Sequence, residues 1–145
     1  TGRVPGVCEG GGTRGGGGVS PTQRSLALLR KQGYHVAVVE KWNPYAKIRQ
    51  DVFGFGDLLA FRSGQPGATL VQTTSGSNVS ARRTKILANP IARDWVKAGN
   101  WIRLEGWAKR GARGQVKRWT ANTEWIVLDQ FPVVLEGDTQ QTEEE

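Results

Sequence analysis

A short turn-forming segment joins two apolar runs near the middle of the chain, and this pair constrains the fold more than any other feature. Residues 57–62 and 69–73 read as strands, and residues 63–67 (Ser-Gly-Gln-Pro-Gly) form a hairpin-type connection between them. The first run opens with Asp57, and the second contains Gln72. Antiparallel pairing therefore predicts that these two side chains lie side by side at one end of a sheet.

A carboxylate at the head of a hydrophobic run is costly to bury unless a metal ion or another partner offsets its desolvation. Many metal-dependent nucleases hold a divalent cation with this geometry. The hairpin therefore indicates nucleic-acid chemistry.

The other elements predict an α/β domain. Ser20, Pro21 and Gln23 are typical of a helix start. The patterns predict helices at residues 21–32, 78–87 and 91–98. They predict strands at 34–40, 57–62, 69–73, 101–106 and 119–128, and a loop at 41–56. We expect a mixed four- to five-stranded sheet flanked by helices. An OB-like barrel is the alternative, and the two longest helical stretches argue against it.

Length and composition indicate one domain with tails. At 145 residues the chain suits a single domain, expected at 20–136. Residues 1–19 are predicted to be a disordered glycine-rich leader, and 137–145 a disordered acidic tail. Cys8 is the single cysteine, which excludes a disulfide framework, and His35 is the single histidine, which leaves a histidine mechanism without partners. No membrane span or signal peptide is recognisable, so we expect a cytoplasmic protein.

The charge balance favours a polyanionic partner. The formal net charge is +7 and the isoelectric point is near 10.1. Tryptophan is abundant, with six residues. Those with basic neighbours are predicted to stack on bases, namely Trp42, Trp107 and Trp119. Those in apolar patterns are predicted to be core, namely Trp95, Trp101 and Trp125.

With this hairpin and element order, the chain resembles the PD-(D/E)xK nuclease superfamily, in particular its small Holliday-junction-resolvase-like and phage-type members. The resemblance covers about residues 22–128 and implies a restriction-endonuclease-like core. In that superfamily the hairpin supplies an Asp, then a Glu, Asp or Gln, one spacer and a Lys. Asp57 matches the Asp, Gln72 matches the second ligand in its amide form, and Thr74 stands where the family has its Lys.

Thr74 leaves two interpretations open, because the family's lysine orients the attacking water or stabilises charge on the phosphate. In the first, a cation from the following helix replaces it. Helical spacing puts Arg82 and Lys85 on one face, toward the cleft, and Arg83 toward solvent or a distant phosphate. In the second, the fold has lost its chemistry and only binds.

The resemblance implies a site for Mg²⁺ or Mn²⁺, with Asp57 and Gln72 as ligands. Because Mg²⁺ takes several oxygen ligands, we expect Glu40 or Asp51 to assist. The expected function is a metal-dependent endonuclease, and the alternative is a catalytically degenerate nucleic-acid-binding domain on the same fold. The expected partner is nucleic acid, most simply DNA, and the resemblance suggests a homodimer. Nucleic-acid contacts are predicted for Arg82, Arg83, Lys85, Lys109, Arg110 and Arg113.

Overall fold

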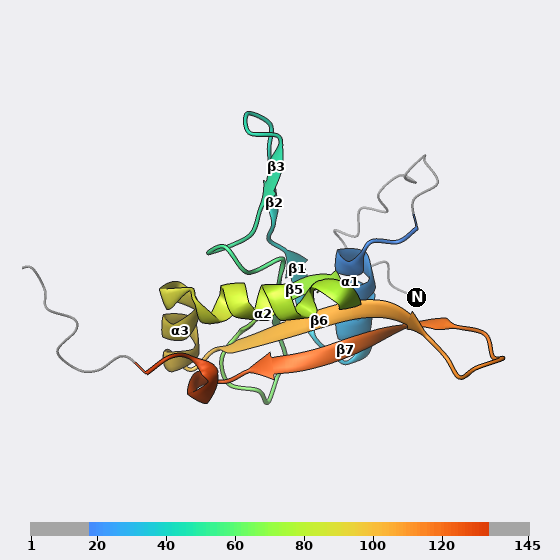
Figure 1. Cartoon of the computed structure of the whole chain (residues 1–145). Coiled ribbons are helices and arrows are strands. Elements are labelled where there is room, and N and C mark those ends of the chain that lie inside the picture. The colour runs from blue at the N-terminus through green and yellow to red at the C-terminus, as the bar shows by residue number, and fades with distance from the viewer. Residues whose placement is uncertain (1–17, 134–145) are drawn as a thin grey trace, which may run out of the picture.

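The computed structural model describes residues 18–133 (Figure 1). Its helices are α1 (Pro21–Lys31), α2 (Val79–Leu87) and α3 (Pro90–Lys97), with short 3₁₀ turns at Gly76–Asn78 and Leu128–Gln130. Its strands are β1 (His35–Val38), β2 (Lys41–Asn43), β3 (Ile48–Gln50), β4 (Leu58–Phe61), β5 (Thr69–Ser75), β6 (Trp101–Arg110) and β7 (Arg118–Ile126). The leader up to residue 17 and the tail from residue 134 lie outside the described residues.

Five of the strands form one mixed sheet in the order β1-β4-β5-β6-β7. Only the central β5–β6 pair is parallel, and the other three pairs are antiparallel. In the β4–β5 hairpin, Leu58 pairs with Val71 and Ala60 with Thr69. The α/β class, the mixed five-stranded sheet and the hairpin are therefore confirmed.

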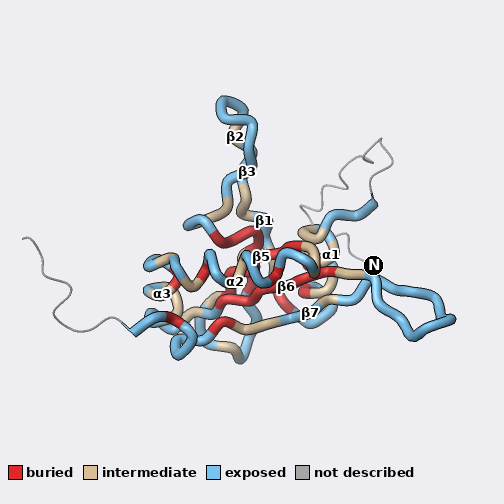
Figure 2. The backbone as a smooth tube through the Cα atoms, viewed as in Figure 1, coloured by how far each residue is buried: buried red, intermediate tan, exposed pale blue. Residues whose placement is uncertain are grey.

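Helices cover both faces of this sheet. Helix α1 packs against β1, β4 and β5 on one face, and α2 and α3 pack against β5 and β6 on the other. Figure 2 shows the buried backbone concentrated in the central strands between these layers. The core under α1 is small: Leu29, Tyr34, Leu58, Ala60 and Val71. The core under α2 and α3 is larger: Phe55, Leu70, Val79, Ile86, Ala92, Ile102, Leu104, Ile126 and Phe131.

The residues at the start of α1 cap and begin the helix as the sequence predicts. The Ser20 side chain accepts a hydrogen bond from the Gln23 backbone N–H at 3.2 Å, and Pro21 occupies the first helical turn. Gly33 follows the helix with φ of 92°, a conformation that favours glycine. The predicted helices agree with the structure to within one or two residues.

The prediction of a loop over residues 41–56 is wrong for the first part of this segment. Residues 41–50 form a second, two-stranded sheet in which β2 pairs with β3, here called the arm. The arm projects away from the body of the molecule (Figure 1). Its turn is closed by Asn43, whose Oδ1 accepts hydrogen bonds from the backbone N–H groups of Tyr45 and Ala46 at 3.0 and 3.1 Å.

The β6–β7 hairpin also differs from the expectation. Strand β6 extends to Arg110, four residues beyond the prediction, whereas β7 begins one residue earlier and ends two residues earlier than predicted; Lys109 and Arg110, which the sequence placed between the two strands, therefore belong to β6. Lys109 pairs with Trp119, and Arg110 pairs with Arg118. The connecting loop is therefore shorter and lies at the tip of a long ribbon (Figure 1).

Candidate metal site

Asp57 is fixed at the entrance of β4 by its own backbone. Its N–H donates to the Val71 carbonyl at 2.9 Å, and its carbonyl accepts from the Val39 N–H at 3.0 Å. The residue is only 4 % exposed. Its Oδ2 accepts three hydrogen bonds: from Gln72 Nε2 at 2.9 Å, from the Thr73 N–H at 2.8 Å and from Thr73 Oγ1 at 3.1 Å. The carboxylate is thus held in one orientation at the sheet end.

Two further carboxylates meet Asp57. One ligand oxygen each from Glu40, Asp51 and Asp57 lies within 4.8 Å of the others, and we call these three residues the acidic group. Glu40 directly precedes the arm and Asp51 directly follows it, so pairing of β2 with β3 brings them together. A tight turn after Asp51, closed by the Val52–Gly56 bridge, returns the chain to β4. The expectation that Glu40 or Asp51 lies beside Asp57 is confirmed for both.

The acidic group carries more negative charge than its surroundings compensate. Burial, a hydrogen bond that protonated Asp57 donates to the Asp51 carboxylate, and the charges of Asp51 and Glu40 raise the pKa of Asp57 to about 8, against the lowering effect of the Thr73 N–H. None of these causes is a cation. Arg49 contacts the group at its edge, with Nη1 2.9 Å from Glu40 Oε1, but its side chain is 66 % exposed.

The donor set suits a hard divalent cation. Carboxylate oxygens are the ligands that Mg²⁺, Mn²⁺ and Ca²⁺ prefer. A dication would remove the repulsion that raises the pKa of Asp57, because it stabilises the ionised form of all three carboxylates. The acidic group could therefore hold a metal ion.

Gln72 and Thr74 lie where the sequence places them on β5. Gln72 is 3 % exposed and donates its amide N–H to Asp57, so the expected proximity is confirmed. This contact gives it a positioning role, and direct ligation by its carbonyl oxygen stays a prediction. Thr74 is 6 % exposed and lies near the C-terminal end of the β5–β6 pairing, opposite Gly106.

The basic residues of α2 do not make the contacts that the sequence predicts for them. Arg83 was expected to meet solvent or a distant phosphate; instead it makes a bidentate ion pair with Glu124 on β7, with Nε–Oε2 of 2.6 Å and Nη2–Oε1 of 2.7 Å, and a phosphate contact stays a prediction. This pair raises the pKa of Arg83. Within residues 18–133, Arg82 and Lys85 make no side-chain hydrogen bond or ion pair, Arg82 being half-buried and Lys85 exposed. Whether either replaces the missing lysine stays a prediction.

Other basic residues belong to the β6–β7 ribbon. Lys109, Arg110 and Arg113 are exposed. Trp119 lies under two cations, with Arg24 Cζ 4.1 Å and Lys109 Nζ 5.6 Å from its ring centre. Trp119 is 44 % exposed, which leaves its predicted role in base stacking open.

Two tryptophan assignments are corrected. Trp107, expected at the surface, is only 8 % exposed, and its indole N–H donates to Ser25 Oγ at 2.8 Å. Trp101, expected in the core, is 38 % exposed. Lys109, the basic residue that suggested the first assignment, lies two positions further along β6 and is exposed, so its charge does not report the burial of Trp107.

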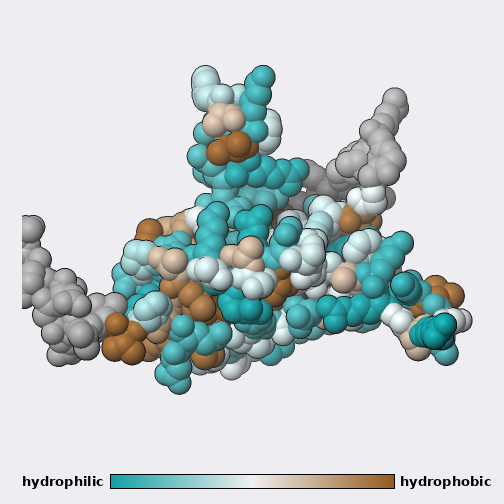
Figure 3. Space-filling model, viewed as in Figure 1, coloured by the Kyte–Doolittle hydropathy of each residue, from teal (hydrophilic) through white to brown (hydrophobic). Residues whose placement is uncertain are grey.

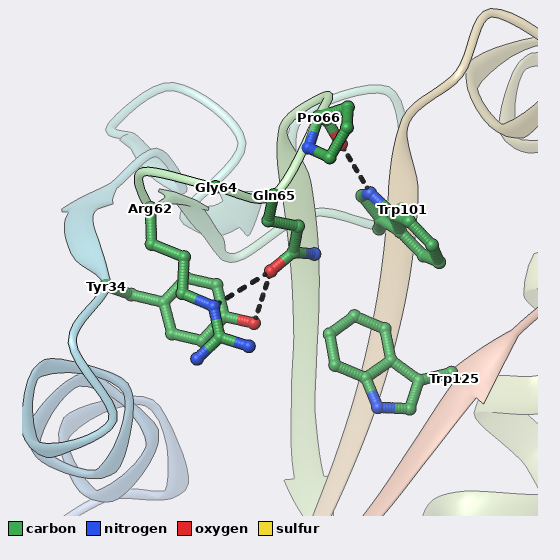
Figure 4. Close-up of a pocket in the computed structure, with 7 residues that line it drawn as sticks. All are labelled: Tyr34, Arg62, Gly64, Gln65, Pro66, Trp101 and Trp125. Carbon is green, nitrogen blue, oxygen red and sulfur yellow. Dashed lines mark hydrogen bonds between the residues drawn. The ribbon is translucent and has the colours of Figure 1, made fainter.

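Trp101 lines an open pocket at the far end of β4 from Asp57 (Figure 4). Its ring meets Trp125 edge-on, with ring centres 5.9 Å apart. On the opposite wall, Gln65 Oε1 accepts from Tyr34 Oη at 2.8 Å and from Arg62 Nε at 3.1 Å. None of the described residues that line this pocket carries a carboxylate, so it offers no ligand set for a hard divalent cation.

Sequence reasoning missed a buried network under α1. Glu105 is fully buried and accepts from Ser25 Oγ at 2.5 Å, from Arg103 Nε at 2.5 Å and from Thr123 Oγ1 at 3.2 Å. Trp107 donates to the same Ser25 hydroxyl. The available signal was Ser25 on the apolar face of α1, because a small hydroxyl there indicates a polar partner across the interface.

Comparisons with known proteins add no family to this geometry. No protein-family model matches the chain, and the searches of curated proteins and of solved structures gave no match either. None of the helices within residues 18–133 combines the length and apolarity needed to cross a membrane. Functional inference therefore depends on the site.

Proposed function

We propose that this protein is a metal-dependent nuclease that hydrolyses nucleic-acid phosphodiesters, with the acidic group binding Mg²⁺ or Mn²⁺. The observation that carries the proposal is the convergence of Glu40, Asp51 and a buried Asp57 within 4.8 Å, with no cation among the causes of the Asp57 pKa shift. Structural carboxylates that are buried in a fold are normally paired with a cation inside it.

The residues around the site have separable roles. A bound divalent cation would supply Lewis-acid activation of water and neutralise phosphate charge. Gln72 and Thr73 fix the Asp57 carboxylate through hydrogen bonds to Oδ2. Arg82 and Lys85, on the helix that follows β5, are available for phosphate because neither makes an ion pair among the described residues.

Two features away from the site support the same function. The chain carries a net charge of +7, which favours a polyanionic substrate. The element order also supports it: α1, the β1-β4-β5 antiparallel strands, the α2 crossover and the parallel β6 are the arrangement that the resemblance to PD-(D/E)xK nucleases implies.

A second candidate is a nucleic-acid-binding domain on the same fold without catalysis. Thr74 favours it, since a buried threonine stands where the resemblance expects a lysine. In this case the acidic group binds a structural cation or none.

Substitution of Asp57 separates the two candidates. For a nuclease, Asp57→Ala should abolish Mg²⁺- or Mn²⁺-dependent cleavage of branched, duplex or single-stranded DNA and retain binding. For a pure binder, it should bind as well or better, because a negative charge leaves the site. Asp94→Asn, an exposed carboxylate on α3, is the matched control and should leave cleavage unchanged. Absence of cleavage of all three DNA forms by the unmodified protein with either metal would exclude the nuclease.

A further inference from the structure

The arm exposes large apolar side chains that do no packing in the body. Tyr45 at its turn is 96 % exposed, Trp42 on β2 is 60 % exposed, and Ile48 on β3 is 52 % exposed. No residue of the arm belongs to either hydrophobic core. Figure 3 shows brown and pale side chains on the projecting arm, surrounded by hydrophilic ones. Large apolar side chains that a projecting hairpin exposes in this way are available to a binding partner.

The arm is nevertheless a preformed structure. Its two strands pair over three positions, including Trp42 opposite Arg49 and Asn43 opposite Ile48. The Asn43 side chain closes the turn, and Lys47 adopts the left-handed conformation with φ of 54°. A rigid scaffold presents side chains at a lower entropic cost of binding than a mobile loop does.

The charge of the arm is entirely positive. Residues 41–50 contain Lys41, Lys47 and Arg49 and no acidic residue. Aromatic rings interleaved with cations are the combination that binds single-stranded nucleic acid, because the rings stack on bases and the cations contact phosphates.

The arm also stands next to the acidic group. Glu40 immediately precedes it and Asp51 immediately follows it, so both ends of the arm supply carboxylates of the same site. At about 3.3 Å per residue, the strands place Trp42 and Tyr45 within roughly 7–17 Å of those carboxylates along the chain. A strand whose bases contact the arm would have its backbone near the acidic group.

From these four observations we infer that the arm binds unpaired bases of the nucleic-acid substrate beside the site of hydrolysis, with Trp42 and Tyr45 as stacking platforms. This inference rests on the proposed function. Unpaired bases are favoured over an intact duplex because stacking needs an exposed base face. Reading a duplex groove needs free polar groups, and the amide oxygen of Asn43 is already used in the turn.

The test compares two DNA probes on the full chain without divalent metal, in EDTA, so that binding is measured apart from cleavage. The probes are a blunt duplex and a splayed fork with the same duplex and two unpaired arms, followed by fluorescence anisotropy. Trp42→Ala and Tyr45→Ala should each weaken fork binding about fivefold or more and change duplex binding less than about twofold. Trp42→Phe and Tyr45→Phe should retain most of the fork affinity, because they keep a ring.

Two controls complete the design. Val116→Ala, at the tip of the other hairpin and 80 % exposed, should change neither affinity. Lys47→Gln should weaken both probes alike, because its contribution is electrostatic. Circular dichroism should be unchanged for every arm variant, since the arm contributes nothing to the core.

Equal weakening of fork and duplex by the alanine variants, or weakening of neither, would overturn the inference. Failure of the proposed function gives a different pattern. In that case the unmodified protein cleaves no DNA with Mg²⁺ or Mn²⁺, while the selective loss of fork binding by Tyr45→Ala still identifies the arm as a surface for unpaired bases.

Discussion

Two buried carboxylates at the same sheet make an instructive pair. Glu105 is 0 % exposed and Asp57 is 4 % exposed, and each accepts three or more hydrogen bonds. Glu105 is paired with the guanidinium of Arg103, two residues away on β6. Asp57 instead faces two more carboxylates. The charge of Glu105 is thus compensated within the fold, whereas that of Asp57 is not.

The difference is the one expected between a structural carboxylate and the metal ligand proposed for Asp57. The Arg103–Glu105 ion pair compensates the buried charge within β6, and the hydrogen bond from Ser25 to Glu105 connects α1 to that strand, so this carboxylate needs no cation from outside. An uncompensated acidic group lowers stability in the free protein, and such a cost is typical of sites that bind a ligand of opposite charge. The comparison can be tested by replacing each carboxylate, or the cation beside it, and measuring the free energy of unfolding.

The largest effect is expected from breaking the Arg103–Glu105 pair. Glu105→Gln or Arg103→Met should lower the free energy of unfolding by about 3–5 kcal/mol, because each leaves one buried charge unpaired. Urea denaturation measures this. The double variant Arg103→Met/Glu105→Leu should be less destabilised than either single variant, and a double variant as unstable as the sum of both would contradict the compensation argument.

An intermediate effect is expected from Asp57→Asn as a function of pH. The pKa of Asp57 is about 8 in the fold and about 3.9 when unfolded, so unfolding between these values releases a proton. The contribution of Asp57 to the free energy of unfolding therefore falls as pH rises from about 4 to 8. Without metal, Asp57→Asn should match the unmodified protein near pH 4 and exceed it by a few kcal/mol at pH 8, with an upper limit of about 5 kcal/mol from about 1.4 kcal/mol per pKa unit. Urea curves at the two pH values measure this, and an equal offset at both would refute it.

The smallest effect is expected from Arg49→Ala. If Arg49 compensated the acidic group as Arg103 compensates Glu105, its removal would cost several kcal/mol. Its exposed side chain predicts less than about 1 kcal/mol at moderate ionic strength. Thermal or urea unfolding of this variant beside Arg103→Met compares the two cations directly, and losses of equal size would erase the distinction between the two carboxylates.

Sequence patterns were sufficient for the central hairpin. Its turn residues and apolar runs fix the β4–β5 pairing, and the pairing brings Gln72 to Asp57. The arm was not predictable in the same way. It pairs over only three positions and buries no face, so its residues show no alternation of apolar and polar side chains.

The network around Glu105 escaped prediction for another reason. Alternation along residues 101–106 shows that Arg103 and Glu105 share a face, but it does not show that α1 covers that face. A charged face is ordinarily assigned to solvent. The contact between Ser25 and Glu105 joins residues 80 positions apart, and local patterns carry no information on such pairings.

The position of the arm between Glu40 and Asp51 has a thermodynamic consequence. Any displacement of the arm also moves two of the three carboxylates, so the proposed metal site and the proposed base-binding surface share one mechanical element. Linkage then requires reciprocity: if a bound strand on the arm tightens the affinity for the cation by some factor, the cation tightens the affinity for that strand by the same factor. The site would therefore be assembled most completely when its substrate is present.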